Sequence, residues 1–167
     1  MKILLACEGQ SEVELISNLI ERGYLHFDAP LLLDRPIVLR QLTKIAYVIN
    51  TLDIKEEIIV YRIGDTLNEE LSYKGLEMRK PYISEYKICT KPELEILIII
   101  NERLLDSYKK CSRTTKPKSF VNSCIDEYCP KTYFEKNDLV NAINEYKHIK
   151  KHKKDEHYLA DLLDKYK

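Results

Sequence analysis

The chain has 167 residues, enough for one domain with a full-sized hydrophobic core. It carries 27 Lys and Arg against 27 Asp and Glu, so no net charge draws it toward nucleic acid or a membrane surface. Any contact with a polyanion must therefore come from a local patch. We find no secretory signal segment and no apolar run long enough to span a bilayer, so we expect a cytoplasmic protein.

The five cysteines point to a reducing compartment. Their number is odd, their spacing is irregular and no C-x-x-C pair occurs. Cys7 and Cys89 lie in apolar runs, where a reduced thiol behaves as a small hydrophobic side chain. We therefore expect no disulfide framework.

The chain opens with a strand and a helix of the kind that builds parallel sheets. The apolar run over residues 1–7 does not alternate, which is typical of a strand buried on both faces. Ser11 followed by Glu14 matches a capping box, so we expect a helix there that Gly23 ends. Further elements are expected in chain order: a strand at 30–33, a helix within 38–52, and strands at 57–63 and 82–89.

The remainder of the chain is expected to be helical. Thr90 and Glu93 form a second capping box, which predicts a helix through residue 107. Asp138 is expected to cap another helix that reaches about residue 152. The other expectations are a basic linker or mobile loop at 109–118, a short helix and turn at 120–134, and a final amphipathic helix at 155–166.

Together these elements predict an α/β fold with a mostly parallel central sheet, helices on both faces and a helical C-terminal part. This arrangement is Rossmann-like in its general form. We expect a core over residues 1–110 and a helical extension over residues 111–167 that packs on the same domain.

Acidic residues fall where such a sheet binds ligands, outside the carboxyl ends of its strands. Glu8 follows the first strand directly, and Asp65 follows the third. Carboxylates that converge repel each other unless a hard cation neutralises them, and Mg²⁺ takes oxygen ligands of this kind. A magnesium ion so held can clamp phosphoryl oxygens and activate water.

Two further acids allow two interpretations each. Glu12 is either a site residue or an acid that the dipole favours in the first turn of a helix. Glu95 lies in an apolar run, where a buried carboxylate needs a cation or a metal as its partner. Alternatively, it shares an exposed stripe with Glu102 and Asp106.

Three short segments resemble one family. The segment Cys-Glu-Gly-Gln-Ser-Glu at 7–12 is similar to the E-G-x-[ST]-E opening of Toprim-like proteins, nearest to the small RloB-like proteins of bacterial phage-defence loci. Residues 59–65 stand where this family has a strand ending in D-x-D. Residues 92–97 match a later helix that opens with P-x-[FLY]-E, which places Glu95 on the acidic position.

This resemblance implies a Toprim-like nuclease that uses Mg²⁺ or Mn²⁺ to cut DNA or RNA phosphodiesters in phage defence. Glu8 and Glu12 would be the catalytic acids, and Glu8, Asp65 and Glu95 the metal ligands. The D-x-D pair is incomplete, because Leu67 stands in place of its second acid if Asp65 is the first, and Ile63 stands in place of its first acid if Asp65 is the last. The alternative is therefore a non-catalytic binding or sensor subunit of a defence complex.

Two basic segments are candidates for binding a nucleic acid, either DNA or tRNA, because phosphate contacts come mostly from Lys and Arg. The alternative is a solvated helix face with no partner. The first segment holds Lys109, Lys110, Arg113, Lys116 and Lys118, and the second holds Lys147, Lys150, Lys151, Lys153 and Lys154.

Overall fold

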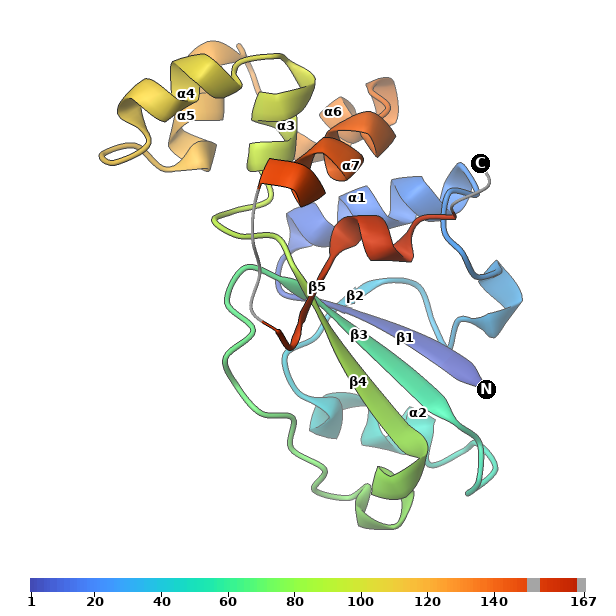
Figure 1. Cartoon of the computed structure of the whole chain (residues 1–167). Coiled ribbons are helices and arrows are strands. Elements are labelled where there is room, and N and C mark those ends of the chain that lie inside the picture. Colours follow the sequence, from blue (N-terminus) through green and yellow to red (C-terminus); the bar gives the residue numbers. More distant parts are fainter. Residues whose placement is uncertain (150–153, 165–167) are drawn as a thin grey trace.

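The computed structural model describes residues 1–149 and 154–164. Its centre is a five-stranded sheet in the order β2-β1-β3-β4-β5, and every neighbouring pair is parallel (Figure 1). The predicted α/β fold with a parallel central sheet is confirmed. The strands are β1 (Lys2–Cys7), β2 (Ile37–Val38), β3 (Ile58–Gly64), β4 (Ile83–Cys89) and β5 (Glu156–Tyr158).

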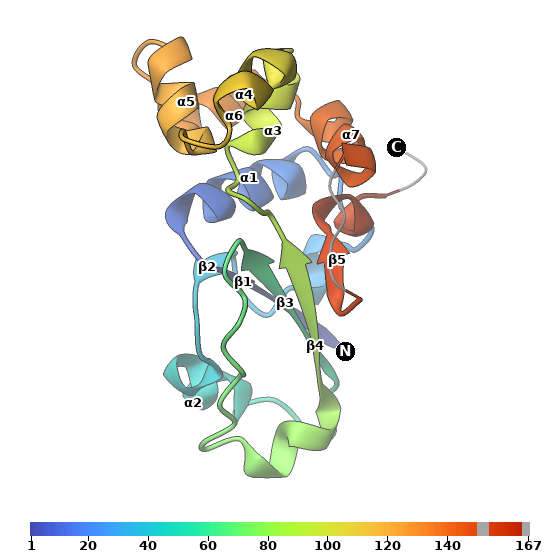
Figure 2. The ribbon, with the colours of Figure 1, turned by 60° about the vertical axis from the view of Figure 1, so that its left-hand side comes forward.

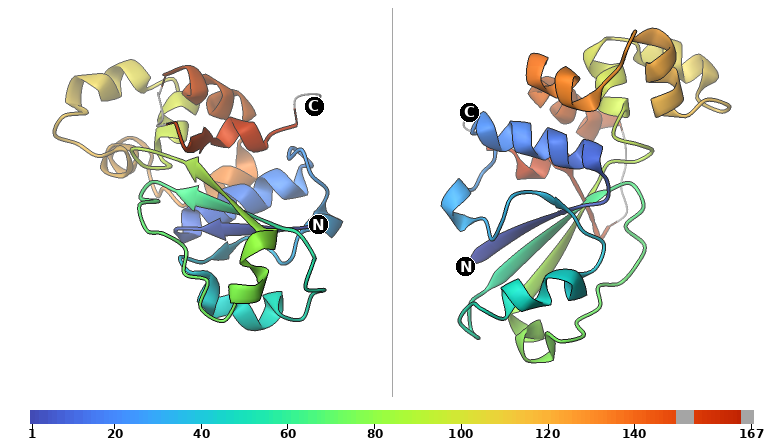
Figure 3. Two further views of the ribbon diagram at one scale, coloured as in Figure 1. Left: turned by 60° about the horizontal axis from the view of Figure 1, so that its bottom comes forward. Right: turned by 180° about the vertical axis from the view of Figure 1, so that it is seen from behind.

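Helices cover both faces of this sheet (Figures 2 and 3). In the described part of the chain, no helix is long and apolar enough to cross a membrane. The α-helices are α1 (Gln10–Glu21), α2 (Ala46–Ile49), α3 (Ile96–Asn101), α4 (Leu105–Cys111), α5 (Pro117–Cys124), α6 (Pro130–Lys136) and α7 (Val140–Ile149). Short 3₁₀ helices are η1 (Ala29–Leu31), η2 (Leu42–Ile45), η3 (Glu77–Tyr82) and η4 (Leu159–Leu162).

The non-alternating sequences of β1 and β3 follow from burial on both faces. Odd-numbered residues such as Leu5 and Ile63 enter a large core beneath α1, α3 and α7. Even-numbered residues such as Leu4 and Val60 enter a smaller core beneath α2 and the 3₁₀ helices. Each fully buried Leu or Ile contributes about 1.5–3 kcal/mol to the free energy of unfolding. These two strands are therefore the most firmly anchored part of the sheet.

Helix α1 begins and ends at glycines. Its N-cap is Gly9, whose backbone is extended and which offers no side-chain cap, so the predicted capping box of Ser11 and Glu14 is wrong. The helix starts earlier than predicted because it follows the end of β1 almost directly. Gly23 ends the helix as predicted: its φ is 67°, and the next amide, of Tyr24, donates to the carbonyl of Leu19.

The second strand lies later than predicted. Residues 29–31 form η1 instead, and Leu32 makes only an isolated bridge to Ile3. Proline lacks the N–H that a strand ladder needs, so residues beside Pro30 do not build a strand. The pairing with β1 is made by β2, directly after Pro36.

The long helix predicted after Thr90 is also wrong. Helix α3 begins only at Ile96, its N-cap Glu95 makes no side-chain cap, and no capping box forms. The Thr90 hydroxyl is buried without a hydrogen-bond partner among the described residues. At Arg103 the backbone takes a left-handed turn with φ 57°, which separates α3 from α4.

The basic segment at 109–118 is ordered into helices instead of forming a linker. It includes the end of α4 and the start of α5, and buried Tyr108 and Pro117 anchor the two helices. The helix and turn expected over 120–134 correspond to the end of α5 and most of α6.

The C-terminal part adds a strand that the sequence did not predict. The Asp138 carboxylate accepts the Val140 N–H at 2.9 Å, as expected for the start of α7. The final helix predicted at 155–166 is wrong, because β5 and η4 occupy this region. Strand β5 pairs with β4, and the Glu156 carboxylate accepts from Lys91 Nζ. These long-range contacts outweigh the local helical pattern.

Arg62 is the one buried arginine of β3. Its side chain is 5% exposed, and Nη1 donates to Glu85 Oε1 at 2.6 Å and to the Glu69 carbonyl at 2.7 Å. A buried guanidinium needs such partners, because its desolvation is costly.

We expect Arg62→Leu to lower the free energy of unfolding by about 2–3 kcal/mol, because it leaves Glu85 without its cation. The double variant Arg62→Leu/Glu85→Leu should regain most of that loss. Urea denaturation of the single and double variants measures both effects. If Arg62→Leu were as stable as the wild type, the ion pair between Arg62 and Glu85 would not stabilise the fold.

Candidate functional site

Glu8 lies at the carboxyl edge of the sheet, as predicted. Its backbone N–H donates to the Ile63 carbonyl at 2.8 Å, so β1 and β3 are still joined at this point. Its carboxylate Oε2 accepts the Thr66 N–H at 2.8 Å, and Oε1 lies 3.8 Å from Arg40 Nη2. The side chain is 17% exposed, so it is held in place but accessible.

Gly64 makes room for Glu8. A Cβ at position 64 would lie 2.4 Å from Glu8 Oε2 and 2.6 Å from Glu8 Cβ. Both distances are well below contact distance, and the Glu8 Cβ cannot move without the strand. Gly64, the last residue of β3, therefore makes room for Glu8. Asp65, which follows it, supplies a second acid.

Asp65 follows β3 and is half-buried, and its Oδ1 accepts the Thr66 hydroxyl at 2.8 Å. The parallel register pairs Cys7 with Ile63, so the chain leaves β1 and β3 side by side. The two predicted acids are therefore brought to the same edge by the sheet itself.

Glu12, in the first turn of α1, links the acids. Burial raises the pKa of its carboxyl and a hydrogen bond from its own backbone lowers it, while the charges of Asp65, Glu95 and Glu8 raise it further. Oε2 lies 3.1 Å from where a Cβ of Gly9 would stand, so the side chain folds back over the turn. The sequence left the role of Glu12 open. In the structure, the charges of the other three carboxylates all act on Glu12.

Glu95 is 5% exposed, which excludes the predicted alternative of a solvent-facing stripe. Burial raises the pKa of this carboxyl, its own backbone hydrogen bond and Lys118 lower it, and Glu93 and Asp65 raise it. Within residues 1–149 and 154–164, no Lys, Arg or His nitrogen forms an ion pair with it. A buried carboxylate of this kind favours a proton or a bound cation.

We call Glu8, Glu12, Asp65 and Glu95 the acid cluster. Its donor atoms are all carboxylate oxygens, the ligands that Mg²⁺ and Mn²⁺ prefer. In the described part of the chain, no three His, Cys, Asp or Glu side chains are already grouped closely enough to hold a metal ion. The donor chemistry thus fits a hard divalent cation, whereas binding one would require the carboxylates to draw together.

Sequence reasoning missed Tyr128, which precedes α6. Its hydroxyl is buried with no hydrogen-bond partner among the described residues. Burial raises the pKa of this phenol, and the charges of Glu95 and Glu12 raise it further. Helix α6 packs against α1. No local pattern around residue 128 marks it.

The first basic segment lies beside the acid cluster. Glu93 Oε2 accepts the Lys118 N–H at 3.0 Å, and Glu93 Oε1 lies 3.9 Å from Lys116 Nζ. The other three cations of this segment are exposed on α4 and the turn that follows, where Lys109 pairs with Asp106 at 3.1 Å. The remaining two are Lys110 and Arg113.

The second basic segment is only partly described. Lys147 Nζ pairs with Asp161 and lies 5.5 Å from the centre of the Tyr158 ring, so its charge is already engaged. Lys154 is exposed. The other predicted contacts, Lys150, Lys151 and Lys153, lie outside the described residues.

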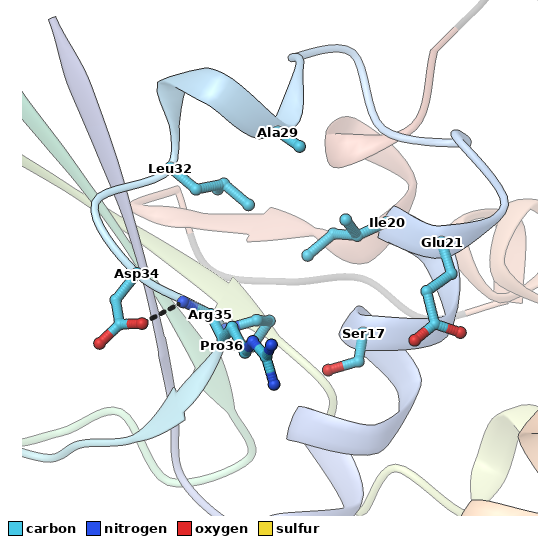
Figure 4. Close-up of a pocket in the computed structure, with 8 residues that line it drawn as sticks. All are labelled: Ser17, Ile20, Glu21, Ala29, Leu32, Asp34, Arg35 and Pro36. Atoms are coloured by element: carbon cyan, nitrogen blue, oxygen red, sulfur yellow. Dashed lines mark hydrogen bonds between the residues drawn. The ribbon is translucent and has the colours of Figure 1, made fainter.

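A larger cavity lies elsewhere. It has a volume of about 520 Å³ and opens beside the second half of α1 (Figure 4). Its polar groups are Ser17, Glu21, Asp34 and Arg35, and none of the predicted site residues lines it. A smaller cavity of about 30 Å³ lies under Glu8, between Arg40 and Arg62. Arg40 is a second residue that the sequence analysis missed.

Comparisons with family models, with curated proteins and with solved structures find no match to this chain. The interpretation of the site therefore depends on its own chemistry.

We expect Gly64→Ala to lower the free energy of unfolding by about 1–3 kcal/mol, because the added methyl group overpacks the contact with Glu8. Gly9→Ala is the matched control, since its methyl group would meet only the flexible end of Glu12, at 3.1 Å. Urea denaturation compares the two. If Gly64→Ala cost no more stability than Gly9→Ala, the close approach of Glu8 would be refuted.

The raised pKa of Glu95 predicts a stability difference that depends on pH. Above the ordinary value of 4.5, the folded state retains a proton that the unfolded state has lost. The free energy of unfolding therefore falls as the pH rises from 4.5 through the raised pKa. Glu95→Gln does not have this loss.

In metal-free buffer at pH 8, we expect Glu95→Gln to melt about 2–4 °C above the wild type, the shift that about 1 kcal/mol produces in a domain of this size. At pH 4 the two melting temperatures should agree. Thermal unfolding followed by circular dichroism gives both values, and Glu145→Gln serves as the exposed control. Equal melting temperatures at pH 8 would show that ionisation of the buried Glu95 carboxylate does not destabilise the folded state.

Proposed function

We propose that the protein is a Toprim-like nuclease that depends on Mg²⁺ or Mn²⁺ and hydrolyses phosphodiesters in DNA or RNA. The observation that carries this proposal is the acid cluster at the carboxyl edge of the parallel sheet, where the sequence places a ligand site. Glu95 supports it most strongly, because its carboxylate is 5% exposed and has no cation in ion-pair distance among the described residues. A buried carboxylate without an ion-pair partner favours a proton or a cation, and a divalent metal ion would be such a cation.

Glu8, Asp65 and Glu95 are the residues that would hold the metal. When bound, the divalent ion supplies neutralisation of charge on the phosphoryl oxygens and a more acidic water. The Thr66 N–H orients Glu8 by donating to Oε2, which leaves Oε1 on the side of Arg40.

Glu12 is best suited to moving a proton. Its raised pKa lies closer to neutral pH than that of an ordinary glutamate, which is what an acid–base catalyst requires. Burial raises the pKa of the Tyr128 phenol and the charges of Glu95 and Glu12 raise it further, while its buried hydroxyl has no hydrogen-bond partner among the described residues. Glu8 then has mainly a ligand role and Glu12 mainly the acid–base role.

We place this activity in the bacterial cytoplasm and, following the resemblance to RloB-like proteins, in phage defence. All five cysteines are free, and Cys7 and Cys89 are buried, as suits a reducing compartment. The choice between DNA and RNA as substrate depends on chemistry that the acid cluster itself does not provide.

The second candidate is a non-catalytic binding or sensor subunit of a defence complex. If Asp65 is the first D-x-D acid, Leu67 stands in place of the second and is packed at 8% exposure, so this position offers no ligand. Asn101 stands near the end of the apolar run, where RloB-like proteins often carry a histidine, and it donates to the Tyr133 hydroxyl at 2.9 Å and not to the acid cluster. These two departures favour a scaffold that has lost turnover.

The nuclease proposal is tested by incubating single- and double-stranded DNA and tRNA with the protein in Mg²⁺ or Mn²⁺. We expect Glu12→Gln and Asp65→Asn each to reduce cleavage by at least about 100-fold, the usual contribution of acid–base catalysis. Glu14→Gln is the matched control, because Glu14 shares α1 with Glu12 but accepts from Gln10 instead. Cleavage that survives both substitutions would exclude the acid cluster as its source.

Metal binding has its own readout. We expect Mn²⁺ to raise the melting temperature of the wild type by several degrees and to have little effect on Asp65→Asn or Glu95→Gln. A metal shift without cleavage supports the non-catalytic candidate with a retained metal site. No metal shift and no cleavage would remove the enzyme proposal.

A further inference from the structure

A polyanion that approaches the acid cluster meets four carboxylates, so a nuclease built on this edge needs cations around it. Two groups of cations lie there, on opposite sides of the cluster. Arg40 lies on the side of Glu8, and Lys116 and Lys118 lie on the side of Glu95.

Arg40 is placed by the sheet. It lies two residues beyond β2, which pairs with the end of β1, so it leaves the sheet next to Glu8. Its Nη2 is 3.8 Å from Glu8 Oε1, and its side chain is 65% exposed. Such a long, exposed ion pair contributes little to stability, so the guanidinium is free to form paired hydrogen bonds with a phosphate.

Lys116 and Lys118 are placed by α5, which packs against α3 (Figure 2). Glu93 Oε2 accepts the Lys118 N–H at 3.0 Å and so fixes the first turn of α5 against the segment that leads into α3. The Lys116 side chain is 82% exposed and its Nζ is 3.9 Å from Glu93 Oε1. The charge of Lys118 reaches Glu95, which is buried and has no ion-pair partner in the described chain.

We propose that a nucleic-acid backbone crosses the carboxyl edge of the sheet from Arg40 to Lys116 and Lys118, with the acid cluster beneath its central phosphate. This inference rests on the proposed function and defines how that site takes its substrate. Arg40 binds a phosphate on the Glu8 side, and the two lysines bind one on the Glu95 side. We call these residues the two cationic rims.

The separation of the rims requires a polymer. Arg40 follows β2 and Glu95 follows β4, and three strand spacings across the sheet amount to about 14 Å. One phosphate cannot contact both rims, whereas a strand of several nucleotides can. The track also excludes Lys147, whose ammonium is held by Asp161 and the Tyr158 ring.

The test measures the affinity of the full chain for a fluorescein-labelled single-stranded 12-mer, as DNA and as RNA, by anisotropy in Ca²⁺ at 0.1 M salt. We expect Arg40→Gln and Lys118→Gln each to weaken binding by about 3–10-fold. Each should also lower the slope of log affinity against log salt by about 0.7, the value for one phosphate contact on a single strand.

Two cationic controls accompany these variants. Arg35→Gln removes an arginine that lines the distant cavity beside α1 (Figure 4), and Lys147→Gln removes the cation that is already engaged. Both should bind as the wild type does. A single mononucleotide should bind at least about 100-fold more weakly than the 12-mer and should not distinguish Arg40→Gln from the wild type.

The outcomes separate this inference from the nuclease proposal. If the wild type binds and cleaves but Arg40→Gln and Lys118→Gln bind equally well, the cationic rims are wrong and the nuclease stands. If binding depends on both rims but Mg²⁺ and Mn²⁺ give no cleavage, the track stands and the nuclease fails. Loss of binding in Lys147→Gln alone, or no binding by the wild type, overturns the track.

Discussion

The parallel pairing of β1 with β3 is the constraint on which the rest of the site depends. It continues past the last residue of β1, because the Glu8 N–H still donates to the Ile63 carbonyl at 2.8 Å. At that point the two chains are so close that only a glycine fits at position 64. The sheet therefore delivers Glu8 and Asp65 to one place without help from loop packing. Helices α1 and α3 then add one acid each from the same face.

The consequence is electrostatic. Carboxylates that share a partly buried space raise one another's affinity for protons, and Glu12 shows this with contributions from all three neighbours. Charge of one sign that is withdrawn from water must be offset by protons or by cations. Arg40 offsets part of this charge beside Glu8, and the charge of Lys118 does so at Glu95.

Several elements were predictable because their cause is local. The apolar runs of β1, β3 and β4 predict strands wherever they lie, and the left-handed φ of 67° at Gly23 is a conformation that glycine adopts readily. Helix starts were less predictable, since the capping boxes at Ser11 and Thr90 both failed. Helix α1 follows β1 after two residues and α3 follows β4 after six, and neither helix has a side-chain cap at its start.

By itself the sequence determined the parallel α/β core and the acids that follow its strands, because strand burial and strand ends are written in runs of a few residues. Only the tertiary structure decided that Glu12 joins Glu8, Asp65 and Glu95, since proximity between α1, α3 and two strand ends is not a local property. The same holds for Tyr128 and Arg40, because the local sequences around them do not indicate a site. It holds also for β5, where pairing with β4 and the ion pair from Lys91 to Glu156 overcome a helical pattern. Long-range contacts of this kind have no signature in a window of neighbouring residues.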